Sequence, residues 1–253
     1  MAKKTRTPPP PRRPVQAPQR RQEPSPEDRR KRLLLLAFAA AGLVALGVVI
    51  AVVAFTGGSG GASNGGSSAV AATMRGAGCT YRDTAGIKAE SNHANVTSAE
   101  VKTAFGDGKG VVDGVIHYWT YPPANGPHYG VPVVWNFYDQ AVPIPSVVHN
   151  EEHGGMVIWW GPQVPSSTVD ELRDFYRSDP VSIVGTPAPR LGNKIALTAW
   201  TGDPKNYFKN GNYGTGHVAI CPRFDEKAFK AFRDAYRGKG PEGVPMDVNQ
   251  PGT

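Results

Sequence analysis

Residues 146–160 read SVVHNEEHGGMVIWW, and this stretch combines a short helical pattern, a glycine pair and an apolar run. Residues 146–153 can form about two helical turns that end at Gly154, because glycine readily takes the left-handed conformation that closes a helix. Residues 156–160 are rich in β-branched and aromatic side chains, which predicts a buried strand. We therefore expect a helix and a strand joined by Gly154 and Gly155.

The same kinds of signal on both sides of this stretch predict an α+β domain. Thr168 and Glu171 form a capping-box pattern that opens a helix over residues 168–177, and Asp225 caps a helix over residues 225–237. A weaker helical pattern covers residues 97–105. Further strand candidates are residues 114–119, 181–184, 195–200 and 217–221. We expect a small mixed or antiparallel sheet with two to three helices packed on it.

A long uncharged run near the N-terminus predicts a membrane anchor. Residues 33–55 carry no charge and directly follow the basic run Arg29-Arg30-Lys31-Arg32. A helix that crosses a hydrocarbon core of about 30 Å needs roughly 20 apolar residues. A cleaved signal peptide fits less well, because its apolar region would be about 7 to 15 residues long and nearer the N-terminus. The small residues after Phe55 could still hold a cleavage site, but we expect a single transmembrane helix that acts as a signal anchor.

The charge distribution predicts how this helix is oriented. Residues 1–32 hold eleven lysines and arginines against three acidic residues, so they account for the whole net charge of +7. The positive-inside rule places such a tail in the cytoplasm and the C-terminal part outside the cell membrane. A basic, proline-rich tail beside a membrane serves topology and contact with anionic lipids, so we expect no nucleic-acid partner.

Composition divides the chain into five parts. Residues 1–32 are too rich in proline and too poor in large apolar residues to fold, so we expect a disordered cytoplasmic tail. Residues 33–55 form the transmembrane helix, and residues 56–76 form a linker rich in Gly, Ser and Ala. The extracytoplasmic α+β domain covers residues 77–242. A flexible C-terminal tail covers residues 243–253.

Cys79 and Cys221 are the two cysteines of the chain, and both lie on the oxidising side of the expected topology. This compartment favours a disulfide between them. Two separate buried thiols are the alternative, whereas a redox pair is disfavoured because no C-x-x-C arrangement is present.

Four of the six histidines fall within 37 residues, among several tyrosines and tryptophans. His149 and His153 are four residues apart, so both imidazoles would project from one face of a short helix and could share a metal ion. His128 follows a proline-rich turn and is the best third ligand, and His117 is the fourth candidate. We expect Glu152 and Tyr129 to contact these ligands and orient them without binding the ion. Imidazole ligands favour Cu or Zn over Ca or Mg, and otherwise we expect no cofactor.

The order of residues in this region resembles a bacterial family. The stretch HYWTYPPANGPHY at residues 117–129, followed by VHNEEHGG at residues 148–155, is similar to the domain-of-unknown-function family 3105. Asn125 and Glu151 depart from the family pattern, which has Ser and Leu at these positions. Residues 195–200 and 232–242 share the resemblance. It implies an exported or single-pass protein of the cell envelope and brings no established activity.

Three interpretations of the histidines remain open at this level. The first is a transition-metal site, and the second is a structural hydrogen-bonded network in an envelope module that binds another protein or a small ligand without metal. The third is a zinc-dependent hydrolase, because His149-x-x-Glu152-His153 formally matches H-x-x-E-H, with Glu152 as the base. The short helix argues against that motif. Catalytic residues therefore stay unknown, and whether the protein is an enzyme stays open.

The expected topology gives a first prediction. In intact cells, external protease should remove the chain after Gly57 and leave residues 1–32 protected, because the basic tail stays in the cytoplasm. Immunoblots against tags at both ends measure this. Protection of the C-terminal tag would contradict the assignment.

Overall fold

The computed structural model describes residues 64–88, 101–207, 209 and 211–253 of the chain. The expected tail at residues 1–32 and the expected transmembrane helix at residues 33–55 lie outside these residues. Among the helices of the described part, none has both the length and the apolar character needed to span a bilayer.

The described residues form an α+β fold, as expected, but they contain four α-helices and two mixed sheets rather than two to three helices and one sheet. The helices are α2 (Asn64–Gly76), α3 (Ile144–Glu152), α4 (Ser166–Ser178) and α5 (Glu226–Tyr236), with short 3-10 turns at Pro189–Leu191 and Met246–Val248. The strands are β1 (Thr80–Ala85), β2 (Lys102–Phe105), β3 (Gly110–Val112), β4 (Val115–Tyr118), β5 (Met156–Trp160), β6 (Ile183–Pro187), β7 (Ile195–Thr201) and β8 (Thr215–Cys221).

The larger sheet has the order β1-β8-β7-β5-β6. Its strand pairs are antiparallel except for β5 and β6, which run parallel with Met156 opposite Ile183. The smaller sheet has the order β2-β4-β3, with β2 parallel and β3 antiparallel to β4. Helix α4 makes the crossover between β5 and β6, which is the kind of connection that a parallel pair needs.

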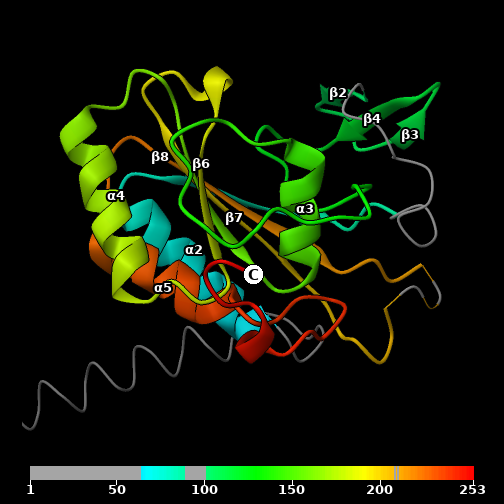
Figure 1. Cartoon of the computed structure of the whole chain (residues 1–253). Coiled ribbons are helices and arrows are strands. Elements are labelled where there is room, and N and C mark those ends of the chain that lie inside the picture. The colour runs from blue at the N-terminus through cyan, green and yellow to red at the C-terminus, as the bar shows by residue number, and fades with distance from the viewer. Residues whose placement is uncertain (1–63, 89–100, 208, 210) are drawn as a thin grey trace, which may run out of the picture. The chain divides into compact units, whose positions relative to one another are not determined.

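Strand β5 is buried on both faces, which explains its continuous apolar sequence. Met156 and Ile158 pack in the core shared with α2, α4 and α5, whereas Val157 and Trp159 belong to the cluster on the opposite face, with α3. Figure 1 shows the same division, with α2, α4 and α5 on one side of the sheet and α3 on the other. Helix α3 is thus separated from the other helices by the sheet.

Two helix predictions differ from the structure, one at its end and one at its start. The expected helix over residues 97–105 is wrong at its end, because Lys102–Phe105 is strand β2 and pairs with β4 in parallel register. Pairing with a neighbouring strand outweighs a weak local helix preference; the earlier part of this segment lies outside the described residues. Helix α4 begins at Ser166 after Pro165, so Thr168 does not cap it. Asp225 does cap α5, as predicted, by accepting a hydrogen bond from the Ala228 amide at 2.9 Å.

The packed domain extends beyond both expected boundaries. Helix α2 occupies Asn64–Gly76, within the expected linker at residues 56–76, and Val70 and Met74 are buried in the main core. At the other end, the expected tail at residues 243–253 is held by hydrogen bonds from the Ser182 amide to the Asn249 carbonyl and from the Trp135 amide to the Thr253 carbonyl, both 2.9 Å. Composition did not reveal either segment, because each has few apolar residues and folds only against the rest of the domain.

The predicted disulfide is confirmed. Cys79 lies between α2 and β1 and Cys221 ends β8, and their sulfurs are bonded. Both residues are buried in the main core. The bond therefore ties the N-terminal helix of the described domain to a central strand.

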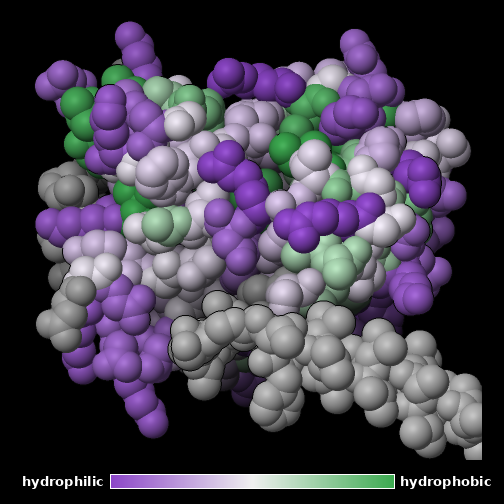
Figure 2. Space-filling model, turned by 180° about the vertical axis from the view of Figure 1, so that it is seen from behind, coloured by the Kyte–Doolittle hydropathy of each residue, from purple (hydrophilic) through white to green (hydrophobic). Residues whose placement is uncertain are grey.

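The surface carries few large apolar side chains. Among the described residues, only Val112, Val131, Val134 and Val248 are large, apolar and exposed. Figure 2 views the molecule from behind relative to Figure 1. Where grey atoms do not cover this face, small apolar patches are interspersed with polar residues. This face therefore offers no broad apolar surface of the kind that marks a protein interface.

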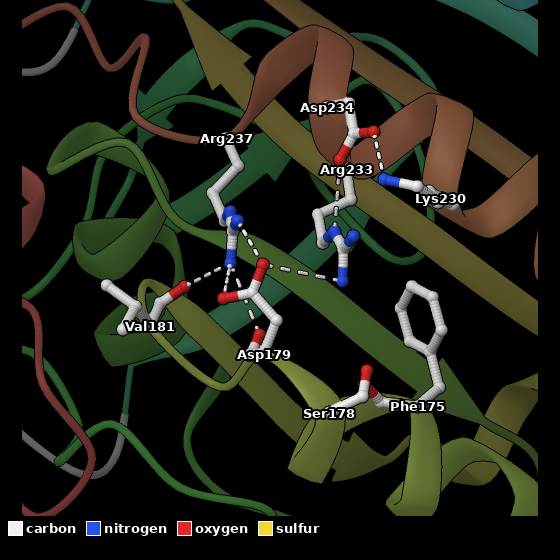
Figure 3. A network of polar contacts seen from close by, with 8 residues as sticks. All are labelled: Phe175, Ser178, Asp179, Val181, Lys230, Arg233, Asp234 and Arg237. Carbon is white, nitrogen blue, oxygen red and sulfur yellow. Dashed lines mark hydrogen bonds and ion pairs between the residues drawn. The ribbon is translucent and has the colours of Figure 1, made fainter.

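A polar network joins α5 to the chain that follows α4 (Figure 3). Arg237 donates to both carboxylate oxygens of Asp179, at 2.6 and 2.8 Å, and to the carbonyl of Val181 at 2.9 Å. Arg233 lies 3.5 Å from the same carboxylate, and its guanidinium stacks over the Phe175 ring. The hydrogen bonds from Arg237 lower the pKa of Asp179. This network fixes the end of α5 against the start of β6.

The Arg237→Lys variant tests this network. Lysine cannot reproduce the forked pair of hydrogen bonds, so the free energy of unfolding in urea should fall by about 1 to 3 kcal/mol, followed by tryptophan fluorescence. Asp179 contributes to the free energy of unfolding at pH values above its unfolded pKa of about 3.9. This contribution is lost as the pH falls through the lower pKa of the folded state. The difference between the two proteins should therefore narrow below about pH 4.

Arg177→Lys is the matched control. Its pair with Asp174 is exposed on α4, so this change should cost less than about 1 kcal/mol. Equal losses in the two variants would contradict a special role for Arg237.

Candidate functional site

The loop after β4 holds His128 in a fixed position. Residues 122–128 are all buried, and the hydroxyl of Tyr118 donates to the carbonyl of Pro127 at 2.7 Å. Gly126 has φ of +123°, and a Cβ there would lie 3.2 Å from both Ile87 and Tyr118. The backbone conformation and the close contacts together require glycine at this point.

Asn125 ties the same loop to the end of β1. Its side-chain oxygen accepts from the Ile87 amide at 3.2 Å, and its nitrogen donates to the hydroxyl of Thr84 at 3.1 Å. Asn125 is one of the two positions that depart from the resembled pattern. A shorter serine side chain could not reach both partners in the same way, so the asparagine has a structural role here.

Helix α3 supplies the other residues of the site, and its first turn begins two residues earlier than expected. Pro145 in that turn costs no hydrogen bond, because the first amides of a helix have no partner within it. His149 and Glu152 are buried side chains three residues apart on this helix. The helix ends at Glu152 with His153 as its C-cap, and Gly154 directly after the cap has φ of +89°, the left-handed conformation expected there.

Backbone carbonyls fix the tautomers of two histidines. Nδ1 of His128 lies 2.8 Å from the carbonyl of Gly126, and Nδ1 of His149 lies 2.7 Å from the carbonyl of Tyr129. A carbonyl can only accept, so each Nδ1 carries the proton and each neutral ring has its lone pair on Nε2. Tyr129 was expected to support the ligands, and it does orient His149, but through its main chain.

Glu152 lies between His128 and Tyr207. Its Oε1 accepts a hydrogen bond from the Tyr207 hydroxyl. Its Oε2 lies 2.9 Å from Nε2 of His128 but has no partner that meets hydrogen-bond geometry among the described residues. Burial alone would raise the pKa of Glu152, but the contacts with His128 and Tyr207 outweigh burial and lower the pKa. The carboxyl group is therefore ionised at neutral pH.

His128, His149 and Glu152 form a group that could hold a metal ion. Each offers one ligand atom, and these atoms all lie within 4.8 Å of one another. The three residues are 3%, 4% and 1% exposed. The structure thus brings together two of the predicted ligands, and it adds Glu152 as a candidate ligand rather than only as support.

His153 lies beside this group and nearer to solvent. Its Nε2 is 3.0 Å from Nε2 of His149 and 3.2 Å from Oε2 of Glu242. The side chains of His153 and Glu242 are 23% and 31% exposed. His153 was predicted as a ligand of the same ion, but it is not among the three residues whose ligand atoms all lie within 4.8 Å of one another.

His117 lies in another environment. Its Nδ1 is 3.0 and 3.1 Å from the two carboxylate oxygens of Asp107, and it sits on β4 of the smaller sheet. The structure gives it an acidic partner of its own and does not place it in the group described above. The prediction of His117 as a fourth ligand therefore has no support from the geometry.

Sequence reasoning missed Tyr207 and Glu242. Tyr207 lies in the chain between β7 and β8, with no motif around it. Glu242 ends the segment 232–242, whose resemblance to the family was a signal that could have drawn attention to it. Both reach the site only because the chain folds back over α3, which no local pattern encodes.

A second histidine network lies on the larger sheet. Nδ1 of His217 is 2.7 Å from Asp83, and Nε2 is 2.8 Å from the hydroxyl of Thr201. The ring stacks on Tyr236, with 3.8 Å between centroids. Both ring nitrogens are satisfied, so His217 links β1, β7, β8 and α5 as a structural residue.

Glu151 is buried without the compensation that Glu152 receives. It is 0% exposed, and neither carboxyl oxygen has a partner of good hydrogen-bond geometry among the described residues. Burial raises the pKa of Glu151 far above its ordinary value, and a contact with Thr198 offsets this rise only in part. A carboxyl group here is an energetic cost to the fold.

The comparisons with known proteins agree with the resemblance noted in the sequence. A family model described as "Protein of unknown function (DUF3105)" matches residues 111–247. This range contains His117, His128, His149, Glu152 and Glu242. The search of curated proteins and the search of solved structures found no match.

The Glu151→Leu variant tests the cost of the buried carboxyl. Leucine has a similar volume and no polar atoms, so the free energy of unfolding should rise by about 1 to 3 kcal/mol. Urea unfolding at neutral pH, followed by tryptophan fluorescence, measures the change. Glu151→Gln keeps a buried polar group and should give a smaller gain. A loss of stability in the leucine variant would show that Glu151 has a partner that stabilises it.

Proposed function

Because the chain belongs to the DUF3105 family, whose description assigns no activity, we propose a function from the site itself. The domain binds one transition-metal ion, Zn or Cu, through Nε2 of His128, Nε2 of His149 and the carboxylate of Glu152.

The contact between His128 and Glu152 is the observation that carries this proposal. Nδ1 of His128 donates a hydrogen bond to the Gly126 carbonyl. If the ring is neutral, its Nε2 therefore directs a lone pair at Oε2 of Glu152, which lies 2.9 Å away. In that state the two electron-rich atoms repel each other, whereas a cation between them makes the contact favourable, in agreement with the lowered pKa of Glu152 beside His128. A proton can fill this place, and a metal ion can replace the proton.

The donor set favours particular metals. Two imidazoles and one carboxylate form a common zinc-binding set, and they also suit copper, whereas Mg and Ca prefer oxygen ligands alone. The carbonyls of Gly126 and Tyr129 support the proposal, because ligating histidines usually donate their other nitrogen in this way. Three protein ligands leave one position of a tetrahedral ion for another ligand.

We also propose that this site lies outside the cell membrane, on a domain anchored by residues 33–55. The uncharged run and the basic tail before it support this location. The disulfide between Cys79 and Cys221 is consistent with an oxidising compartment.

A metal-free interaction module is the second candidate. An N–H at Nε2 of His153 can be shared between Nε2 of His149 and Oε2 of Glu242 without any ion, which favours a structural network. A zinc hydrolase is less well supported. Its base would be Glu152, but this carboxylate faces His128 and Tyr207 within the ligand group, so it is not free to activate a water molecule.

Metal titration of the full-length chain tests the proposal. Calorimetry with Zn²⁺ or Cu²⁺ should find about one ion per chain, and His128→Ala or His149→Ala should abolish binding because each removes a ligand. Glu152→Gln should weaken binding by roughly tenfold or more, since an amide is a poorer ligand than a carboxylate. His153→Ala should retain one ion.

His117→Ala is the matched control, because this histidine pairs with Asp107 and should leave the affinity unchanged. Tryptophan fluorescence checks that each variant is folded. If the parent protein takes up neither ion, and the histidine variants lose about 1 to 3 kcal/mol of stability with or without metal, the structural network is the better account.

A further inference from the structure

We propose that His153 and Glu242 form an outer metal-binding station, through which the ion passes into and out of the buried site. This inference rests on the proposed metal site and adds a role for two residues outside it.

The buried site needs such a route. His128, His149 and Glu152 are at most 4% exposed, so a hydrated ion in solvent cannot reach all three ligands at once. A transition metal gives up its bound waters more readily when protein donors replace them one at a time. Ligand atoms placed between solvent and the inner group would allow that exchange.

The donor atoms of Glu242, His153 and His149 form a continuous series. Oε2 of Glu242 lies 3.2 Å from Nε2 of His153, which lies 3.0 Å from Nε2 of His149. Two ligands of one tetrahedral zinc ion, with bonds of about 2.0 to 2.1 Å, lie about 3.3 Å apart. Each neighbouring pair is therefore close to the separation at which both atoms can hold the same ion.

His149 belongs to both sets of ligands. Its Nε2 faces His153 on the outer side and is within 4.8 Å of the ligand atoms of His128 and Glu152 on the inner side. Its Nδ1 is held by the Tyr129 carbonyl, so the ring keeps its direction while the ion changes partners. An ion can move from Glu242, His153 and His149 to His149, His128 and Glu152 without leaving His149.

Hydrogen bonds to backbone carbonyls at the end of α3 hold the outer residues in place. The Asn249 side chain donates to the carbonyl of His153 at 3.0 Å, and the Gly238 amide donates to the carbonyl of Gly154 at 2.8 Å. Gly240 lies so close to the end of α3 that a Cβ there would be 2.3 Å from the carbonyl oxygen of Glu152. The segment that carries Glu242 is thus pressed against the helix end that carries His153.

The charge and exposure of the outer pair fit a first contact with a cation. Glu242 is a carboxylate with 31% of its side chain in solvent, and His153 is 23% exposed. Carboxylates at the mouth of a site raise the local concentration of cations and their rate of association. Tyr207 reaches Glu152 from another side, but a phenol without negative charge lacks this attraction.

Exchange kinetics with Zn²⁺ on the full-length chain test the proposal. Association is followed by stopped flow against a chromophoric zinc indicator, and release is followed by transfer to an excess of chelator. In Glu242→Gln and His153→Gln, both rates should fall by roughly tenfold or more. The equilibrium dissociation constant should stay within about threefold of the parent value, because a station on the route changes the path and not the end state.

Two variants serve as controls. Glu171→Gln removes an exposed carboxylate on α4 and should change neither rate. Tyr207→Phe removes the hydrogen bond to Glu152 and should alter affinity without slowing association.

The remaining outcomes overturn the proposal in distinguishable ways. Unchanged rates in both outer variants show that the ion takes another route, while the metal site itself stands. Faster release with a matching loss of affinity in His153→Gln shows that His153 is a resident ligand of the bound ion. A parent protein that binds no zinc overturns the metal site and the route together.

Discussion

The steric constraint at Gly154 and Gly155 positions most of the features described above. A Cβ on Gly155 would lie 2.6 Å from the carbonyl of Asn150 and 2.8 Å from the Trp135 ring, and Gly154 has a positive φ and touches Gly238 and Gly240. Only glycine allows the chain to pass from α3 into β5 through so narrow a space. This close turn places α3 flat against one face of the larger sheet, where its histidines meet the loop that carries His128.

The strand that follows this turn explains why the two faces of the sheet differ. Alternate residues of β5 enter separate cores, one shared with α2, α4 and α5 and one shared with α3. The first face is covered by three helices, whereas the second is covered mainly by one short helix and by loops (Figure 1). Loops carry polar groups that need partners, and buried His128, His149 and Glu152 lie on this second face, whereas His217 stacks on Tyr236 of α5.

Two neighbouring glutamates on α3 illustrate how burial is tolerated. Contacts with His128 and Tyr207 outweigh the burial of Glu152 and lower its pKa, whereas burial raises the pKa of Glu151 well above its ordinary value. The same helix thus carries one buried carboxyl group with charge-stabilising contacts and one whose burial is an energetic cost. The difference between the two residues comes from their environment and not from their chemistry.

Local sequence determined the elements whose signals are complete within a few residues. The apolar run of β5, the glycine stop of α3 and the Asp225 cap of α5 are of this kind, and the family resemblance pointed to His128 and His149. The tertiary structure alone decided which histidines meet. His117 and His153 look equivalent to the others in sequence, but one pairs with Asp107 on the smaller sheet and the other faces Glu242. Helix α2, strand β2 and the packed C-terminal residues were likewise beyond local reasoning, because each gains its stability from partners far away in the chain. The alternation of side chains along a helix or strand is a local property, whereas the contact between two buried polar groups depends on how distant segments pack.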